Sequence, residues 1–375
     1  MSSATKVVVA NETGYTSNPG CRAVRRGISR LMELSDVRIG GALPLGFWAN
    51  EFSELAPVRE NWLIRQDGKF ASGTEKAAPI DTVKWKQIRN VLLRRDDAFS
   101  KALEEVDTLV INGEGSLHHN FPRALALLAM ISIAAERGKR VALLNSTIQA
   151  MDSELLMEVL PALGFCHVRE QRTLLAIRDF QPSAFAAPDL AVLAMRVMEP
   201  PYRPRSQVDG KRILVSYGVL VNEKMLRALL RSAKGCGLEP IYLSIGDGGE
   251  TALATRVCAE EGVPLVHAGE INFRRLLELL SSSALAVSGR HHINLFLMRC
   301  GVPILCIPSN TWKLDATFEL SGYPKIELTS VEDIDEMITR AYENRHSLAV
   351  ASREGFRKCA SLIDELPERF RQWIC

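Results

Sequence analysis

Three consecutive polar residues, Arg290, His291 and His292, stand where a predicted apolar strand gives way to a predicted helix. In an open parallel α/β sheet, ligands bind where the carboxyl end of a strand meets the amino terminus of the next helix, and that terminus favours an anion. Lys313 follows the next predicted strand and is expected at the same rim of the sheet. Two cations and two imidazoles at one rim predict a small, highly anionic substrate. The alternative is that one histidine is a core residue and that Arg290 pairs with a carboxylate.

The first half of the chain has two further candidate turns. Gly113, Glu114, Gly115 and Ser116 follow a predicted strand and precede His118 and His119. Glycines there would let a ligand approach the backbone closely. The spacing matches neither a dinucleotide fingerprint nor a P-loop, so a tight turn that packs on the next helix is an equal alternative.

Arg169 and Glu170 end another predicted strand, and they would face the same rim. The alternative is an ordinary surface ion pair, which contributes little to stability.

Composition narrows the class of protein. The 46 lysines and arginines nearly balance the 44 aspartates and glutamates, so the formal net charge of +2 argues against a nucleic-acid partner. The eight cysteines show no zinc-type spacing, which predicts reduced thiols and no metal site. No secretory segment is recognised, and the longest apolar run, 124–135, is too short to span a membrane. These features predict a cytoplasmic protein. Peripheral contact with the inner membrane face through the tail 356–373 stays open, although packing of this tail across the domains is the preferred interpretation.

Hydrophobic periodicity predicts alternating strands and helices in two halves. The first half should contain strands at 6–10, 37–45, 108–112, 140–145, 165–168 and 184–193, and helices at 21–34, 83–102, 122–137 and 152–160, with another from 172. The second half should contain strands at 212–217, 240–245, 264–267, 284–287, 302–307 and 325–328, and helices at 222–233, 250–261, 272–281, 330–344 and 352–372.

This alternation predicts an α/β protein with two Rossmann-like, doubly wound domains that face a cleft and carry closing helices at the carboxyl end. The domains are expected at 1–198, with an irregular insertion at 46–97, and at 211–375, joined by a proline-rich linker at 199–210. The arrangement resembles the GT-B fold of glycosyltransferases.

The motifs, taken in order, resemble those of the polysaccharide pyruvyl transferases. Residues 288–292 are similar to the family's S-x-R-x-H signature, and the resemblance continues to Lys313. Residues 112–117 resemble its G-G-G-x-L turn, with Glu114 in place of a glycine. Residues 168–170 resemble its V-R-[DE] element. Residues 18–23 resemble its N-x-G-D-x-A opening, with Cys21 in place of the acidic residue.

The resemblance implies transfer of the enolpyruvyl group of phosphoenolpyruvate to a sugar of a cell-surface polysaccharide, such as a capsule or exopolysaccharide, or of its precursor. The product would be a pyruvate ketal, with release of phosphate and no further cofactor. Arg169, Arg290 and Lys313 would hold the donor, His292 would be the main acid/base group and His119 a supporting one. The implied substrate-binding residues are Gly113, Glu114, Gly115, Ser116, His118, Glu170, Ser288 and His291.

Two other functions stay open at this point. One is a GT-B glycosyltransferase that uses a nucleotide sugar, because the same cations would hold a diphosphate. The other is a catalytically silent, glycan-binding subunit of a polysaccharide assembly. The sequence leaves open the acceptor sugar, the linkage, whether the acceptor is nucleotide-linked, lipid-linked or polymeric, and whether the protein is a homo-oligomer.

Overall fold

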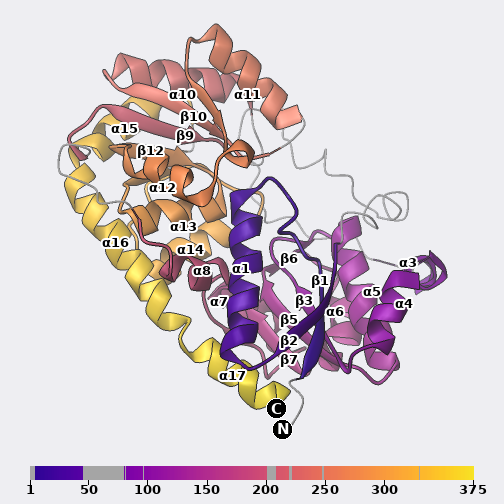
Figure 1. The fold of residues 1–375 in the computed structure, drawn as a ribbon. Helices are drawn as coiled ribbons and strands as arrows, with labels where there is room; N and C mark the ends of the chain where they lie inside the picture. The colour runs from indigo at the N-terminus through magenta and orange to yellow at the C-terminus, as the bar shows by residue number, and fades with distance from the viewer. Residues whose placement is uncertain are drawn as a thin grey trace.

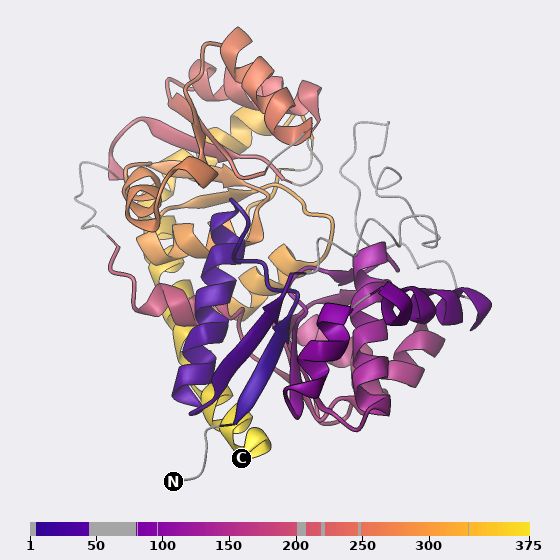
Figure 2. The same cartoon turned by 45° about the vertical axis from the view of Figure 1, so that its right-hand side comes forward.

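The computed structural model describes residues 5–44, 80, 82–95, 97–200, 208–218, 222–246, 249–328 and 330–375. It contains two parallel β-sheets, each flanked by helices, one above the other in the views of Figures 1 and 2. Most of the predicted insertion 46–97 and of the predicted linker 199–210 lies outside the described residues.

The first sheet has six parallel strands in the order β2-β1-β3-β5-β7-β8. Its strands are β1 (Lys6–Ala10), β2 (Arg38–Leu43), β3 (Thr108–Asn112), β5 (Arg140–Ser146), β7 (Phe165–Val168) and β8 (Phe185–Ala186). The accompanying helices are α1 (Pro19–Leu34), α3 (Thr82–Arg95), α4 (Asp97–Glu104), α5 (Pro122–Glu136), α6 (Ser153–Val159), α7 (Gln171–Ile177) and α8 (Ala191–Arg196). Two short strands, β4 (Leu117–His118) and β6 (Ile148–Gln149), pair beside this sheet.

The second sheet has five parallel strands in the order β11-β10-β9-β12-β13. Its strands are β9 (Arg212–Ser216), β10 (Glu239–Ser244), β11 (Leu265–His267), β12 (Leu285–Ser288) and β13 (Ile304–Cys306). The helices of this half are α10 (Glu223–Gly235), α11 (Gly249–Glu260), α12 (Phe273–Ser281), α13 (His291–Cys300), α14 (Lys313–Ser321) and α15 (Ile334–Glu343).

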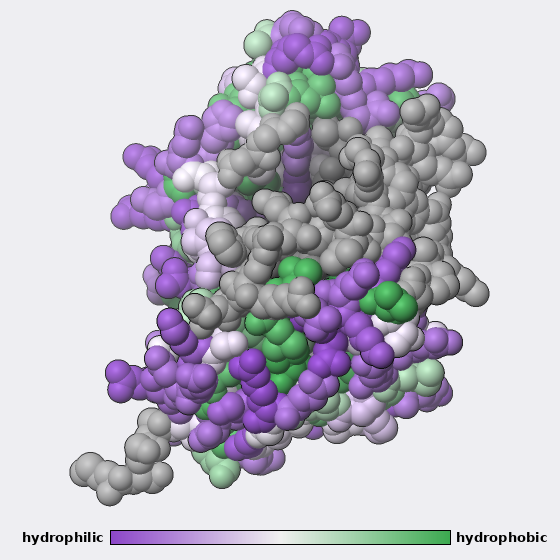
Figure 3. Space-filling view, turned by 90° about the vertical axis from the view of Figure 1, so that its right-hand side faces the viewer, coloured by the Kyte–Doolittle hydropathy of each residue, from purple (hydrophilic) through white to green (hydrophobic). Residues whose placement is uncertain are grey.

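Both sheets are buried because helices cover their faces. All residues of the central strands β3 and β12 are buried, as expected for continuous apolar runs in parallel sheets. The face shown in Figure 3 is mostly hydrophilic where it is described, with small hydrophobic patches between the polar side chains. The α/β class and the doubly wound, GT-B-like arrangement predicted from the sequence are confirmed.

Several predicted elements have different limits in the structure. The predicted strand 184–193 is wrong beyond Phe185–Ala186, because Pro188 and Asp189 end it and Asp189 Oδ1 accepts a hydrogen bond from Ala191 N (2.8 Å) at the start of α8. The predicted strand 325–328 is reduced to one bridge at Glu327, because its neighbour β13 is itself very short.

Three predicted helices also differ. The helix at 83–102 is two helices, α3 and α4. The helix at 330–344 begins only at Ile334, because Ser330 Oγ donates to the Asp333 carboxylate (2.7 Å) and does not cap a backbone amide. The helix at 352–372 is α16 (Arg345–Leu362) followed by α17 (Glu365–Ile374).

The carboxyl-terminal helices connect the two halves. In Figure 1, α16 runs along the second half and α17 lies beside α1 of the first half. The Phe370 and Trp373 rings pack on Phe165 of β7, with ring centroids 5.1 and 5.5 Å away. Arg140 Nη1 donates to the Ile374 carbonyl (2.9 Å). The tail therefore packs across both halves, as the sequence predicts.

Helix α1 packs so closely on the turn before α8 that one position admits only glycine. A β-carbon built on Gly27 would lie 1.9 Å from the Leu190 carbonyl oxygen and 2.6 Å from its carbon, and both atoms belong to the backbone. Helix α1 also carries Gly20 and Cys21 at the cleft, so this contact fixes part of the site described below.

Gly27→Ala is therefore expected to lower the free energy of unfolding by about 3 kcal/mol, because overpacking against a backbone forces helix α1 to move. The measurement is the urea denaturation midpoint. Gly235→Ala at the end of α10 is the matched control, since a β-carbon there meets nothing within 4 Å. Equal midpoints for the two variants would contradict this account of the packing.

Candidate active site

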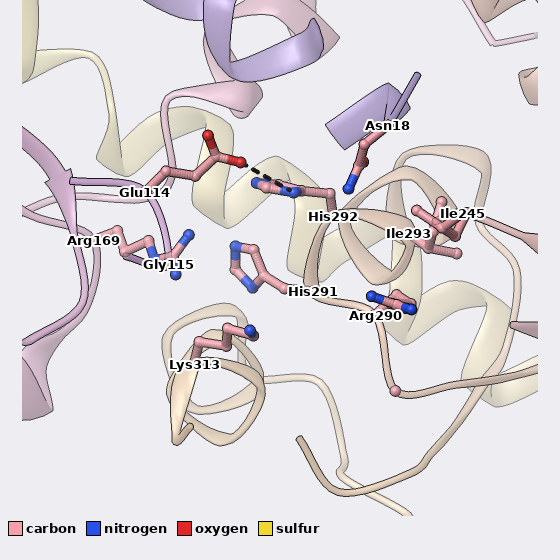
Figure 4. A pocket seen from close by; sticks show the side chains of 11 residues that line it. Asn18, Glu114, Gly115, Arg169, Ile245, Arg290, His291, His292, Ile293 and Lys313 are labelled. Atoms are coloured by element: carbon pink, nitrogen blue, oxygen red, sulfur yellow. Dashed lines mark ion pairs between the residues drawn. The ribbon is translucent and has the colours of Figure 1, made fainter. Parts of the chain in front are cut away.

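A cavity of about 130 Å³ lies between the two halves. The first half contributes Asn18, Glu114, Gly115 and Arg169, and the second half contributes Ile245, Gly289, Arg290, His291, His292, Ile293 and Lys313. Figure 4 shows these side chains converging from both halves. The cavity is smaller than the roughly 300–1,000 Å³ of sites for drug-sized ligands, so it suits a small molecule or part of a larger one.

The topology of both sheets directs loops to this cavity. The strand order reverses between β1 and β3 in the first sheet, and between β9 and β12 in the second. Such reversal points leave a crevice at the carboxyl ends of the strands, where ligands bind. Gly289 after β12 and Gly218 after β9 cross there, and a β-carbon on Gly289 would lie 2.7 Å from Gly218 Cα. The two crevices face each other, so the site contains loops from both.

Asp189 is the central acceptor of the site. Its Oδ2 atom accepts a hydrogen bond from Arg169 Nη1 (2.8 Å) and lies 3.1 Å from His291 Nε2 and 3.4 Å from His292 Nε2. The Arg169 and Asp189 side chains are each only 2% exposed. Burial alone would raise the pKa of Asp189, but His292, His291 and Arg169 together lower it well below the usual value. Asp189 is therefore an ionised, buried anchor for one cation and two imidazoles.

Arg169 presents one part of its guanidinium to the cavity. Its Nε donates to Thr147 Oγ1 (2.7 Å) and its Nη1 to Asp189, but its buried Nη2 has no hydrogen-bond partner among the described residues. A β-carbon built on Gly115 would lie 3.5 Å from this Nη2 and 4.0 Å from Lys313 Nζ. Gly115 thus leaves space beside both cations, and an anion there would satisfy Nη2.

Lys313 begins α14 and donates from Nζ to Asn310 Oδ1 (2.9 Å). Burial, followed by the nearby charges of Arg169 and Arg290, lowers the pKa of Lys313 to about 7. A bound anion would reverse the effect of that repulsion and favour the protonated amine.

Arg290 is held by its own half of the protein. Its Nε donates to the Tyr217 carbonyl (3.1 Å), its Nη2 pairs with Glu250 at the start of α11, and its backbone amide donates to Ser288 Oγ (3.1 Å). The sequence left open whether Arg290 is a cation of the site or the partner of a carboxylate, and the structure shows that it lines the cavity and also pairs with Glu250.

His292 lies against the first half of the protein. Its Nδ1 is 4.0 Å from Glu114 Oε1, and a β-carbon on Gly20 of α1 would overlap its ring. The neighbouring His291 is more enclosed: its Nδ1 lies 3.2 Å from Thr317 Oγ1, and burial lowers its pKa to about 3, with Arg169 adding to the shift. His291 is neutral at pH 7, whereas His292 is the histidine that lines the side of the cavity near Glu114.

The other predicted residues lie around the cavity and do not line it. His118 and His119 are buried with their Nδ1 atoms 2.9 Å apart, and burial lowers the pKa of His118 well below the usual value. Glu170 caps α7 at Thr173 N (2.7 Å) and accepts from Trp312 Nε1 (3.1 Å).

The three small residues Gly113, Ser116 and Ser288 make local contacts around the site. Gly113 approaches Ser146 so closely that a β-carbon would lie 2.5 Å from Ser146 Cβ. Ser116 accepts from Asn11 (3.3 Å), and Ser288 accepts from the Arg290 amide.

Two residues of the site were not predicted as site residues from the sequence. Asp189 is the shared acceptor of the site, and Asn18 lines the cavity. Asp189 stands inside the wrongly predicted strand 184–193, which hid its position at a turn. The available signal is the sequence Pro188-Asp189 before an apolar stretch, which is typical of a helix start. Asn18 has a related signal of a helix start: it is followed by Pro19, and its side chain accepts from Gly20 N (2.8 Å) at the start of α1.

Asp189, His291 and His292 also present three ligand-type atoms within 4.8 Å of one another. The Arg169 guanidinium already contacts the Asp189 oxygen that faces both imidazoles, and a metal cation at that oxygen would be repelled by it. We therefore interpret the group as a hydrogen-bonded ion-pair network.

Comparison with known families settles the classification. A family model described as polysaccharide pyruvyl transferase matches residues 74–311, which is more than half of the chain. The chain belongs to the polysaccharide pyruvyl transferase family. This is a transferase family, and the match includes Glu114, Arg169 and the Arg290–His292 segment. No curated protein matches the sequence of this chain.

Solved structures show the fold that this family member shares. S. aureus MnaA with UDP has a TM-score of 0.55 at 11% identity, covering 98% of this chain and 97% of that one. Arabidopsis thaliana UGT89C1 complexed with UDP-L-rhamnose has a TM-score of 0.56 at 9% identity, covering 100% of both chains. UDP-GlcNAc 2-epimerase from Neisseria meningitidis bound to UDP-GlcNAc has a TM-score of 0.52 at 12% identity, covering 93% and 97%. These GT-B-type proteins establish the fold of the chain.

The predictions about the cysteines and about membrane-spanning segments can also be compared with the structure. All eight cysteines lie in the described part of the chain and are unpaired, five of them buried. No helix in the described ranges has the length and apolar character needed to traverse a bilayer.

Buried neutral histidines predict a specific pH dependence of stability. Burial lowers the pKa of His167 to about 4 and that of His291 to about 3. Because both folded-state values lie below the ordinary value of about 6.5, the unfolded chain binds more protons as the pH falls. The free energy of unfolding should therefore decrease from about pH 7 to pH 5, before ordinary carboxylates titrate.

Urea denaturation at several pH values measures this decrease. His167→Gln should make this decrease shallower, because the variant lacks the buried imidazole. An identical slope for His167→Gln and the wild type would contradict the neutral state of the buried imidazole.

Proposed function

We propose that this protein transfers the enolpyruvyl group of phosphoenolpyruvate to two hydroxyls of one sugar, forming a pyruvate ketal and releasing inorganic phosphate. The acceptor is a sugar of a cell-surface polysaccharide or of its precursor. Membership of the pyruvyl transferase family supports this function. The observation that carries it is the buried Arg169 Nη2, which has no hydrogen-bond partner within the described chain and lies beside the space at Gly115 and Lys313.

Phosphoenolpyruvate carries a carboxylate and a phosphate close together, so its binding needs several fixed donors. Arg169 and Lys313 lie on either side of the space beside Gly115, and a guanidinium suits a carboxylate or phosphate with its paired N–H groups. Helix α13 begins without a side-chain cap, so its first amides and its dipole also favour an anion. Arg290 adds positive charge at the same rim while Glu250 fixes its position.

Ketal formation needs three proton transfers and two new C–O bonds. A sugar hydroxyl attacks C2 of the donor and gives its proton to a base, and the methylene carbon C3 gains a proton to become a methyl group. A second hydroxyl then displaces the phosphate, which leaves with the C–O electron pair, and the proton of this hydroxyl goes to the base or to the departing phosphate. An imidazole can accept and return protons near neutral pH, and His292 is the histidine that lines the cavity beside Glu114.

Neutralising Arg169 or His292 is expected to abolish most of the activity. Arg169→Gln and His292→Gln should each reduce ketal formation by about 100-fold or more, because each removes a charge or a proton carrier at the reacting groups. Mass spectrometry of candidate acceptors incubated with phosphoenolpyruvate detects the pyruvate adduct, and a phosphate assay gives the rate. Arg172→Gln is the matched control, because Arg172 on α7 pairs with Glu319 at the surface.

Wild-type rates in both variants would refute this assignment of the site. Turnover of a nucleotide sugar with release of free nucleotide would instead favour the glycosyltransferase alternative. Failure to bind phosphoenolpyruvate, with a glycan still bound, would favour the silent subunit.

The space at Gly115 gives a second test. Gly115→Leu should raise the KM for phosphoenolpyruvate by about tenfold or more, because the longer side chain fills the space beside Arg169 and Lys313. Gly115→Ala should have a small effect, since its β-carbon makes only ordinary contacts. Steady-state kinetics measure both, and Gly235→Leu in open space is the control. An unchanged KM in Gly115→Leu would place the donor elsewhere.

A further inference from the structure

The two positions at which this chain departs from the family motifs lie in contact. Position 21 holds a cysteine where the N-x-G-D-x-A motif has an acidic residue, and position 114 holds a glutamate where the G-G-G-x-L motif has a glycine. They are 93 positions apart in sequence, yet Cys21 Sγ donates to Glu114 Oε1 at 3.2 Å. One departure removes a carboxylate from α1, and the other introduces a carboxylate beside it.

The Glu114 carboxylate is held firmly. Its Oε2 accepts hydrogen bonds from Thr13 Oγ1 (2.7 Å) and Asn112 Nδ2 (3.2 Å), and the residue is 7% exposed. Burial raises the pKa of the Cys21 thiol well above its usual value, and the charge of Glu114 adds to the shift. The thiol therefore stays protonated and donates to the carboxylate. Three donors, from the loop after β1, from β3 and from α1, thus fix the orientation of the Glu114 carboxylate.

Glu114 lies next to the proposed acid/base group. Its Oε1 is 4.0 Å from Nδ1 of His292, while Asp189 Oδ2 is 3.4 Å from Nε2 on the other side of the ring. Gly20, which precedes Cys21, backs the ring closely. The charged and titratable groups around His292 come from four segments. They are Glu114 from the loop after β3, Asp189 from the turn before α8, His291 from α13, and Arg169, which follows β7 and donates to Asp189.

We infer that Glu114 is a positioning residue for His292 and supplies, from the other loop, the carboxylate that position 21 lacks. The inference rests on the proposed function for the identity of the reaction. When His292 takes the proton of the attacking hydroxyl, carboxylates near both ring nitrogens stabilise the imidazolium that forms. An aspartate at position 21 extends one atom farther than a cysteine, so it would reach the space that Glu114 occupies now.

The test is a cycle of three variants: Glu114→Gly, Cys21→Asp and the double variant, with Cys375→Asp at the exposed carboxyl end as the matched control. Glu114→Gly should lower kcat by about tenfold or more, with a smaller change in the KM for phosphoenolpyruvate. Cys21→Asp should also lose activity, because two carboxylates would stand in contact. The double variant should recover at least tenfold in kcat over Glu114→Gly.

Two further readouts separate positioning from a structural role. Glu114→Gln keeps the shape but removes the charge, so the pH–rate limb that belongs to the acid/base group should shift, and Glu114→Asp should restore it in part. Crystal structures should show the His292 ring reoriented in Glu114→Gly and returned in the double variant.

Wild-type kcat and pH profile in Glu114→Gly, or a double variant no better than the single one, would overturn the inference. If the wild type forms no ketal at all, the proposed function fails, and the ring orientation in the crystals still decides whether Glu114 positions His292.

Discussion

The buried ion pair between Asp189 and Arg169 is the interaction on which the site depends. Both side chains are almost completely inaccessible, and a charge in such a place is stable only when it is paired. Because Asp189 also faces His291 and His292 of the second half, one carboxylate ties β7, the turn before α8 and α13 together. Removing it would leave a buried arginine without its counter-charge and two imidazoles without a shared acceptor.

The same pair explains how several cations can line one cavity before an anion binds there. Arg169, Arg290 and Lys313 repel one another, and this repulsion adds to the effect of burial in lowering the pKa of Lys313. Asp189 accepts a hydrogen bond from Arg169 Nη1, whereas Arg169 Nη2 has no hydrogen-bond partner among the described residues. Glu250 is the counter-charge of Arg290. Neither Asp189 nor Glu250 lines the cavity, whereas Arg169, Arg290 and Lys313 all do.

Much of this arrangement could be predicted from the sequence. The rule that ligands bind at strand carboxyl ends placed Arg169, Arg290, His292 and Lys313 at one rim, and all four line the cavity. Periodicity predicted the two doubly wound halves because buried parallel strands are long apolar runs. Local pattern was weakest where local and long-range preferences compete. The apolar residues after Asp189 suit a strand or a helix, and the helix forms where Asp189 accepts from Ala191 N and α1 packs against α8.

Other features of the site cannot be predicted from a single sequence, because they depend on contacts between residues far apart in the chain. The partners of Arg290 and Cys21 lie 40 and 93 positions away, and no local rule brings them together. The histidines at 118 and 119 could be read as site residues from their position after a glycine-rich turn, but their side chains turn inward and pair with each other. Side-chain direction in an irregular loop depends on the packing of neighbours that the motif does not contain.

The return of α17 to the first half has a consequence for biosynthesis. Phe165 on β7 is covered by Phe370 and Trp373, which are synthesised long after it. Domains generally fold as they emerge from the ribosome, but here the first half keeps an uncovered aromatic surface until α17 has emerged. A nascent chain stalled before α17 would expose that surface to chaperones, and the emergence of α17 would be the event that covers it.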